Sequence, residues 1–424
     1  MKTVNQHALP GPDDITRGIL PNGITVLART NFNSPSVVIG GYLPCGSLFD
    51  PDEKLGLADF TASALLRGSE KRDFQKIFDD LESTGANLSF SAGGHTAGFT
   101  GRCLSEDLPL LLDLLVEALR RPVFPGEQVE RLRAQFLTGL AIRAQDTAEM
   151  ASLTFDQIVF EGHPYAHPDD GWPETIQAIT RADLADFHRI HYGPRGLVLA
   201  IVGAVEPKAI TRQVEKFLGD WTNPFQPELP VLPELKPLKK TVTRKVKIPG
   251  KPQADLVIGT SGPRRKDPEF MPASLGNSVL GQFGTAGRIG EVVREKFGLA
   301  YYASSSLSAG IGPGAWDVSA GVNPGNIQKA RDLICKEIAR FVEKGVTTEE
   351  LADSQSNFIG RLPLSVESNA GVVNALLNIE RFDLGLDYYR RYPHLVQVVT
   401  PEDVLATACK YLHPDKLAVA IAGS

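Results

Sequence analysis

The alternation of hydrophobic and polar positions predicts a chain that mixes short strands with amphipathic helices. Residues 18–28 are predicted to form two strands that turn at Asn22-Gly23, a dipeptide typical of hairpins. Apolar residues recur at helical spacing over 57–66, 74–84, 108–119 and 126–144, and two strands are expected over 88–103. This mixed order indicates an α+β fold, with helices on one face of a largely antiparallel sheet.

An internal repeat divides the chain into two related halves. Segment 179–203 returns at 399–423 with a constant offset, most clearly where Leu197-Val-Leu-Ala-Ile-Val-Gly203 is matched by Leu417-Ala-Val-Ala-Ile-Ala-Gly423. Segment 127–140 is likewise matched by 349–362. We therefore expect two copies of one fold, residues 1–222 and 240–424. Residues 223–239 are rich in proline and are predicted to form a semi-rigid linker.

A helix-to-strand corner in the second half carries a possible functional pair. Residues 289–297 have helical periodicity, Gly298 is a natural helix stop, and 299–307 are predicted to form a strand. Arg294 and Tyr301 flank this corner and could present a guanidinium and a phenol to a carbonyl oxygen, as oxyanion donors without a nucleophile. The alternative is structural: the arginine complements the helix dipole and the tyrosine packs at the strand end.

Composition and charge narrow the possible functions. The 424 residues carry a net charge of -6, which argues against a general binder of nucleic acid or anionic membranes. The four cysteines are isolated, so buried free thiols are expected. No stretch approaches the length of a membrane span, and the first residues lack an apolar region. A cytoplasmic location is expected, or a periplasmic one if a signal peptide has been removed.

Several short motifs are spread along nearly the whole chain. They are Leu20-Pro-Asn-Gly-Ile-Thr-Val26, Gly46-Ser47, Gly56-Leu-Ala58, Gly85-Ala-Asn87, Pro122-Val-Phe-Pro125, His163-Pro-Tyr165, Tyr192, Pro194, Val202-Gly203 and Arg294-Glu-Lys-Phe-Gly-Leu-Ala-Tyr301. In their order and spacing they resemble the pitrilysin and mitochondrial processing peptidase family of inverzincins. The resemblance implies two homologous α+β halves arranged as a clam shell. In active members the first half holds zinc, and an arginine and a tyrosine from the second half complete the site.

The zinc motif of the active family members is missing from this chain. Those members carry H-x-x-E-H on the helix that corresponds to residues 56–68. Here Asp59 stands at the first histidine position, Ala62 at the glutamate and Ser63 at the second histidine, and the third ligand falls at or beside Thr138-Gly139. Because catalytic zinc needs about three protein ligands, we expect no metal site in this chain. The pairs His163/His167 and His188/His191 are expected to be packed or at the surface rather than zinc ligands.

The resemblance implies a non-catalytic subunit of a heterodimeric zinc peptidase. In the family, one kind of subunit keeps H-x-x-E-H and its partner supplies the arginine and tyrosine, so Arg294 and Tyr301 would bind the carbonyl of a peptide substrate beside the partner's zinc. Peptide would add a strand to a sheet edge of the catalytic subunit; whether the corresponding edge here, residues 88–91, binds peptide stays open. The alternative is a catalytically inert scaffold with the same fold, and an autonomous hydrolase has no supporting motif.

Overall fold

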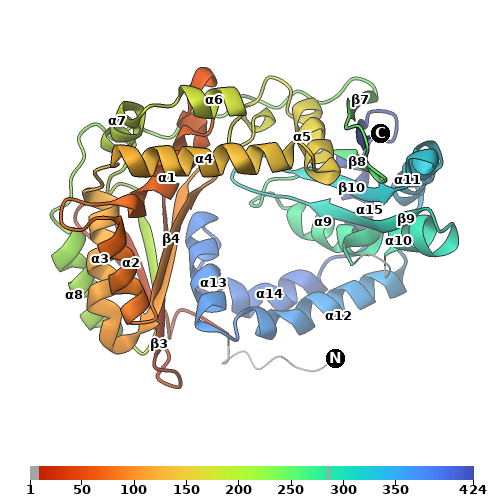
Figure 1. Cartoon of the computed structure of the whole chain (residues 1–424). Coiled ribbons are helices and arrows are strands. Elements are labelled where there is room, and N and C mark those ends of the chain that lie inside the picture. Colours follow the sequence, from red (N-terminus) through yellow and green to blue (C-terminus); the bar gives the residue numbers. More distant parts are fainter. Residues whose placement is uncertain (1–8, 284–286) are drawn as a thin grey trace.

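The computed structural model describes residues 9–283 and 287–424 and contains two β-sheets, each with its own set of helices (Figure 1). Its first half begins with a hairpin and ends with a strand-helix pair. The elements of this half are β1 (Thr16–Ile19), β2 (Thr25–Thr30), β3 (Ser36–Leu43), α1 (Leu57–Ala64), α2 (Phe74–Ser83), β4 (Asn87–Ala92), β5 (Ala97–Leu104), α3 (Leu108–Arg120), α4 (Gly126–Arg143), α5 (Thr147–Val159), α6 (Pro173–Ala178), α7 (Arg181–His191), β6 (Val198–Gly203) and α8 (Pro207–Leu218).

The second half repeats this order with a few changes. Two of its helical segments, η7 (Ser278–Gln282) and η9 (Glu291–Lys296), are π-helical. The remaining elements are β7 (Val242–Lys247), β8 (Ala254–Ser261), α9 (Phe270–Asn277), α10 (Arg288–Gly290), β9 (Ala300–Leu307), β10 (Ala315–Val322), α11 (Ile327–Lys344), α12 (Thr348–Ser365), α13 (Asn369–Arg381), α14 (Tyr388–Gln397), α15 (Pro401–Tyr411) and β11 (Ala418–Gly423).

The strand order confirms that the halves are copies of one fold. The first sheet runs β1-β2-β6-β3-β5-β4 and the second runs β7-β11-β8-β10-β9, so the second reproduces the first without β1. Only the pairs β2–β6 and β7–β11 are parallel; the other strand pairs of both sheets are antiparallel. Strands β4 and β9 end their sheets at equivalent edges. The predicted mixed fold in two related halves is therefore correct.

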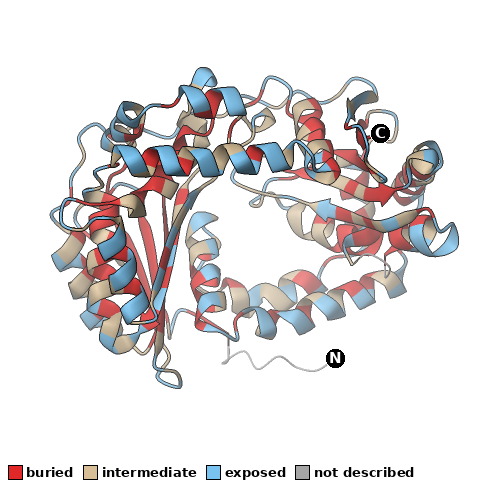
Figure 2. Ribbon diagram, in the orientation of Figure 1, coloured by how far each residue is buried: buried red, intermediate tan, exposed pale blue. Residues whose placement is uncertain are grey.

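Each half builds a core between one face of its sheet and its own helices. In the first half Ile39 and Ile201 pack with Phe60 of α1 and the leucines of α3. In the second half Trp316 of β10 packs with Phe341 of α11, with ring centroids 6.2 Å apart. Figure 2 shows these buried faces turned inward from the exposed outer helices. The burial of these apolar side chains is the main favourable contribution to the stability of each half.

The opposite face of each sheet is covered by a helix from the other half. Helix α13 packs Val372 and Leu376 against Val38 and Val202 of the first sheet. Helix α5 packs Phe155 and its neighbours against the alanines of β11 in the second sheet. We call α5 and α13 the exchanged helices. The expected one-sided packing therefore describes each half's own helices, and the exchange adds a layer that joins the halves.

The linker between the halves is irregular, and two of the four cysteines are buried. Residues 223–239 contain neither helix nor strand, and the boundaries 1–222, 223–239 and 240–424 stay a prediction, because the exchanged helices tie the two halves together. All four cysteines are free thiols, but only Cys45 and Cys103 are buried, whereas Cys409 is exposed. Among residues 9–283 and 287–424, every helix is too short or too polar to cross a lipid bilayer.

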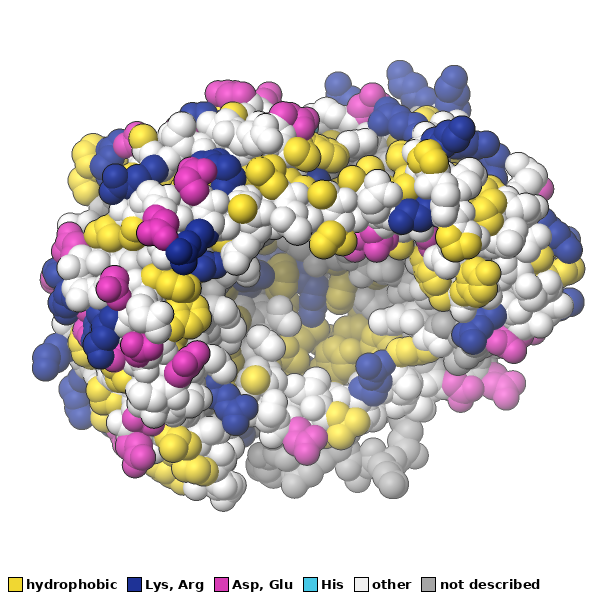
Figure 3. Space-filling view, in the orientation of Figure 1, with side chains coloured by type: hydrophobic (Ala, Val, Ile, Leu, Met, Phe, Trp, Pro, Cys, Tyr) yellow, Lys and Arg dark blue, Asp and Glu magenta, His cyan; other side chains and the backbone are white. Residues whose placement is uncertain are grey.

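A hollow lies between the two halves. In the view of Figure 1 it is bordered by β4 and α13 on one side, by α4 and α5 above, by α12 and α14 below, and by the second sheet on the far side. The space-filling view in Figure 3 shows the same depression on this face of the molecule. The fold therefore places α1 and the corner between η9 and β9 on opposite sides of the hollow (Figure 1).

Candidate functional site

Helix α1, which the resemblance leads us to expect at the position of the zinc helix, is held by hydrogen bonds to its first backbone N–H groups. Gly56 precedes it with a φ of 95°, a conformation that favours glycine. The Asp50 carboxylate accepts hydrogen bonds from the backbone N–H groups of Gly56 and Ala58, both at 2.9 Å. The helix packs against the edge strand β4 and against α4, where the rings of Phe60 and Phe136 stack 5.1 Å apart. Its apolar residues thus serve the core.

The residues at the degenerate motif positions do not form a zinc site. Ala62 is fully buried and Ser63 is half-buried, and neither offers a strong zinc ligand. The Asp59 Oδ1 atom accepts a hydrogen bond from the backbone N–H of Ala92 on β4, at 3.0 Å. Burial raises the pKa of Asp59 to about 6, and the nearby carboxylates of Asp170 and Asp169 add to the shift. Asp59 is therefore a partly shielded carboxyl that already binds the sheet edge.

The position of the third zinc ligand, at or beside Thr138-Gly139, carries none of the usual zinc ligands. Gly139 lies exposed on α4, and a Cβ atom added there would meet no atom within 4 Å. Its neighbour Thr138 donates its hydroxyl to the Ala134 carbonyl of the same helix. Across the described ranges, no group of three or more His, Cys, Asp or Glu side chains could hold a metal ion. The donor set around α1 does not fit zinc, so no step of any reaction is assigned to a metal in this chain.

Three of the four paired histidines, His163, His188 and His191, pack into the fold, and the fourth, His167, is exposed. His188 Nε2 lies 2.9 Å from the Leu119 carbonyl oxygen, and the His191 ring lies 4.4 Å from that of Phe187. Burial lowers the pKa of both histidines to about 4, so both are neutral near pH 7. His163 is buried, and its Nδ1 accepts the backbone N–H of Tyr165. These contacts account for His163, His188 and His191 as structural residues.

The corner that carries Arg294 and Tyr301 differs from an ordinary helix end. The chain runs through the π-helical turn η9, and Gly298, with a φ of 59°, donates its N–H to the Arg294 carbonyl at 3.0 Å. The predicted helix stop at Gly298 is thus correct. In the ladder between β9 and β10, Tyr302 pairs with Gly321 and Ala300 pairs with Val322, which leaves Tyr301 as the extra residue of a β-bulge. A bulge re-aims its side chain relative to the sheet.

Arg294 and Tyr301 both expose their polar groups. The Tyr301 residue is 63% exposed and the Arg294 side chain is 48% exposed. The nearest charge to Arg294 is Glu295, with 3.8 Å between Nε and Oε1, and within the described part of the chain neither side chain makes a hydrogen bond. The structural alternative of a packed tyrosine does not hold for Tyr301. Both groups are available to a ligand or to another protein.

The next residue, Tyr302, shows what a packed tyrosine at this corner looks like. Its hydroxyl donates to the buried carboxylate of Asp255 on β8, at 2.6 Å. Burial, followed by the Asp255 charge, raises the pKa of Tyr302 well above its ordinary value. The sequence pattern did not distinguish the two tyrosines, because only the bulge decides which of them turns into the sheet. Tyr302 supports the strand and Tyr301 is left free.

A second concave region lies where the halves meet. This cavity, of about 580 Å³, is lined on one side by residues of the first half, including His95, Tyr165 and Asp169, and on the other by the loop 308–314. His95 Nε2 and the Tyr165 hydroxyl are 2.5 Å apart. Burial, followed by the charge of Asp169, raises the pKa of Asp156 in this cavity to about 7. Arg294 and Tyr301 do not line it, and the sequence analysis missed it because its parts are more than a hundred residues apart.

Comparisons with known proteins agree with this architecture. Residues 25–160 match the family model described as insulinase (peptidase family M16), and residues 178–358 match the one described as the peptidase M16 inactive domain. The chain is 26% identical over 407 residues to an uncharacterized zinc protease of Streptomyces coelicolor, covering 94% of this chain and 87% of that protein. It is 25% identical over 282 residues to mouse mitochondrial cytochrome b-c1 complex subunit 1, covering 65% of this chain and 57% of that protein.

Solved structures share the fold over almost the whole chain. The crystal structure of a peptidase M16 inactive domain from Pseudomonas fluorescens superposes with a TM-score of 0.88 at 27% identity, covering 97% of this chain and 98% of the other. A protease from Helicobacter pylori, at 17% identity, superposes with a TM-score of 0.89 over 98% of this chain and 100% of its own, which shows a common fold. Together with the matched segments and the two-halved architecture, these similarities place the chain in the peptidase M16 (insulinase) family.

Proposed function

We propose that this chain is the non-catalytic subunit of a heterodimeric zinc peptidase and that it supplies Arg294 and Tyr301 to the active site of a partner that carries H-x-x-E-H. One observation supports this most directly. Both side chains are exposed and make no hydrogen bond with any residue that the structure describes, while the helix equivalent to the zinc helix holds Asp59, Ala62 and Ser63 and has no ligand set. Groups that stabilise an oxyanion are present, and groups that activate water are absent.

The chemistry of the pair fits the stabilisation of a developing negative charge. A guanidinium is charged at any physiological pH and offers several N–H donors, and a phenol offers one O–H donor. Donors aimed at the carbonyl oxygen of a scissile peptide bond bind the tetrahedral oxyanion more tightly than the ground-state carbonyl. When the partner covers the corner, solvent leaves and each donor gains strength. Peptide is the substrate class, and the metal belongs to the partner.

A second candidate is a catalytically inert scaffold of the same fold. The similarity to a subunit of the cytochrome b-c1 complex favours it, since that relative is described as a subunit of a larger assembly. In this case Arg294 and Tyr301 would contribute only to the surface, and replacing them would leave every activity unchanged. The two candidates therefore differ in one measurable property, the dependence of peptide hydrolysis on these two side chains.

The test is reconstitution with a homologous subunit that carries H-x-x-E-H. Peptidase activity and bound zinc are measured for each chain alone and for the mixture. The proposal expects hydrolysis in the mixture only, with zinc carried by the partner. A mixture that forms a stable complex without hydrolysis favours the scaffold. Hydrolysis with stoichiometric zinc in this chain alone refutes both candidates.

A further inference from the structure

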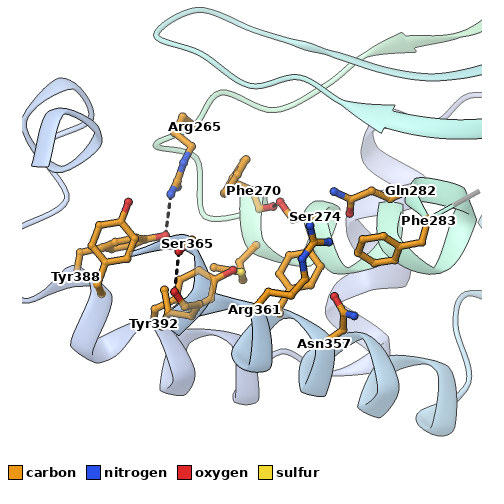
Figure 4. Close-up of a pocket in the computed structure, with 14 residues that line it drawn as sticks. Arg265, Phe270, Ser274, Gln282, Phe283, Asn357, Arg361, Ser365, Tyr388 and Tyr392 are labelled. Carbon is orange, nitrogen blue, oxygen red and sulfur yellow. Dashed lines mark hydrogen bonds between the residues drawn. The ribbon is translucent and has the colours of Figure 1, made fainter. Parts of the chain in front are cut away.

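A cavity in the second half stands apart from the corner that carries Arg294 and Tyr301. It lies between α9 and η7 on one side and helices α12 and α14 on the other, and its volume is about 330 Å³ (Figure 4). That volume is at the low end of ordinary small-ligand sites. The cavity has room for one side chain and a small polar group.

The charged residues that line this cavity are all of one sign. Arg265 and Arg361 line it, and no aspartate or glutamate is among the described residues that line it. Arg361 makes no ion pair or hydrogen bond within the described part of the chain; its guanidinium lies over the Phe283 ring, 5.2 Å from the centroid. Figure 4 shows Arg361 rising from α12 toward Ser274 and Phe283, into the cavity. An arginine held in this way is a ready partner for an anion.

Arg265 approaches from the other side and is fixed by aromatic side chains. Its guanidinium lies 4.1 Å from the centre of the Phe270 ring and donates to the Tyr388 hydroxyl at 2.7 Å. Figure 4 marks the hydrogen bond from Arg265 with a dashed line. Neither of them neutralises the positive charge, because a ring face and a phenol carry no full negative charge. The pair of arginines therefore keeps the cavity electropositive.

The remaining wall combines apolar surface with neutral polar groups. Met271, Phe358, Leu362 and Tyr392 contribute apolar atoms. Gln282 and Asn357 stand at the rim, and their amide groups make no hydrogen bond within residues 9–283 and 287–424. The Ser274 hydroxyl donates a hydrogen bond to the Phe270 carbonyl oxygen, at 2.7 Å. Such a wall complements a ligand with an apolar body and a few polar atoms.

We propose that this cavity binds a carboxylate joined to an aromatic or bulky apolar group, with Arg361 holding the carboxylate, Arg265 adding positive charge from the opposite side, and the aromatic wall holding the body. Two sources share this chemistry: the C-terminal residue of a peptide and a free aromatic acid. A planar guanidinium matches a carboxylate with two parallel hydrogen bonds. The inference uses neither Arg294 nor Tyr301 and does not rest on the function proposed above.

The test is calorimetric titration of the full chain with N-acetyl-phenylalanine and, as a neutral match, with N-acetyl-phenylalanine amide. We expect saturable binding of the acid and at least about tenfold weaker binding of the amide, because the amide removes the charge that the arginines recognise. Equal binding of the two probes, or no binding of the acid at millimolar concentration, overturns the proposal.

Substitution locates the binding. Arg361→Gln removes an exposed, unpaired charge, so we expect an unchanged melting temperature and about tenfold or more loss of affinity for the acid. Arg212→Gln, at an exposed position of α8 in the other half, is the matched control and leaves affinity unchanged. Unchanged affinity in Arg361→Gln overturns the assignment to this cavity. A hexapeptide ending in a free phenylalanine that binds more tightly than N-acetyl-phenylalanine assigns the cavity to peptide ends, and equal affinity assigns it to free acids.

Discussion

Thr147, the first residue of the exchanged helix α5, donates a 2.5 Å hydrogen bond to the buried carboxylate of Asp255 on β8 of the other half. The same carboxylate accepts from the Tyr302 hydroxyl and from the Gln253 side-chain amide. The other exchanged helix has a matching anchor: Asn369, the first residue of α13, donates to the Ser36 carbonyl on β3 at 3.1 Å. Each exchanged helix is thus fixed to the opposite sheet at its N-terminus.

The first prediction concerns this anchor. Asp255→Ala leaves three donors, from Thr147, Tyr302 and Gln253, without their acceptor in or near a buried site. We expect the free energy of unfolding to fall by about 2–4 kcal/mol. Each donor gives up its hydrogen bonds to water on folding and, without Asp255, gains none in return. Urea denaturation measures the loss. The control Asp52→Ala, at an exposed position, is expected to change the free energy by less than about 0.5 kcal/mol, and a similar effect of both variants would contradict the anchor.

The apolar side of the exchange leads to a second prediction. Leu376 of α13 is fully buried against the first sheet, whereas Leu364 of α12 is 69% exposed. Leu376→Ala should cost about 2–5 kcal/mol, since it removes a buried side chain and leaves a cavity, and Leu364→Ala should cost little. If the halves are coupled through the exchanged helices, a fluorescence and a circular dichroism transition in urea remain coincident in both variants. Separate transitions in the unmodified protein would show that each half unfolds alone.

A third prediction follows from two carboxyl groups where α5 covers the second sheet, Asp156 on α5 and Asp317 on β10. Burial raises the pKa of Asp317 to about 7, with the charge of Asp156 adding to the shift, and Asp156 itself has a pKa raised to about 7. The folded state therefore binds protons more tightly than the unfolded state, whose aspartates titrate near 4. The contribution of these two groups to the free energy of unfolding is greatest below pH 4 and falls as the pH rises from about 4 to 7.

Replacing one of these carboxyls with an amide tests whether stability falls as the pH rises. Asp317→Asn removes a group that must ionise in the folded state at high pH, so the variant should gain stability over the unmodified protein, and by at least about 1 kcal/mol more at pH 8 than at pH 4.5. Melting temperatures across that range measure the difference. A gain that does not change with pH would mean that the Asp317 carboxyl does not titrate in this window.

The fourth prediction separates the two neighbouring tyrosines. In the reconstituted peptidase, Arg294→Ala is expected to lower kcat by about two to three orders of magnitude, with Tyr301→Phe also lowering it, because each removes an oxyanion donor. Tyr302→Phe is the control; it should lower stability by about 1.5 kcal/mol through loss of the bond to Asp255 and leave kcat unchanged. Peptide hydrolysis under saturating substrate measures all three. If Arg294→Ala and Tyr301→Phe both keep full activity, the scaffold is the better account.

Local signals in the sequence were enough to predict several features of the structure. Asn22-Gly23 turns the first hairpin with Gly23 at a φ of 92°, and Gly298 ends a helix with a φ of 59°. The repeat at 179–203 and 399–423 becomes the equivalent pairs α7–β6 and α15–β11. These features depend on residues close together in the chain or on direct similarity between segments, and the absence of a zinc motif at Asp59, Ala62 and Ser63 is likewise visible without a structure.

Only the tertiary structure decided where the amphipathic helices dock and which side chains are free. Periodicity tells that α5 and α13 each have an apolar face, but not that each face meets the sheet of the other half, because that choice depends on surfaces far away in the chain. The bulge that exposes Tyr301 and leaves Tyr302 half-buried depends on the register with β10. Arg265 and Arg361, nearly a hundred residues apart, meet at one cavity for the same reason: long-range packing brings them together, and no local pattern records it.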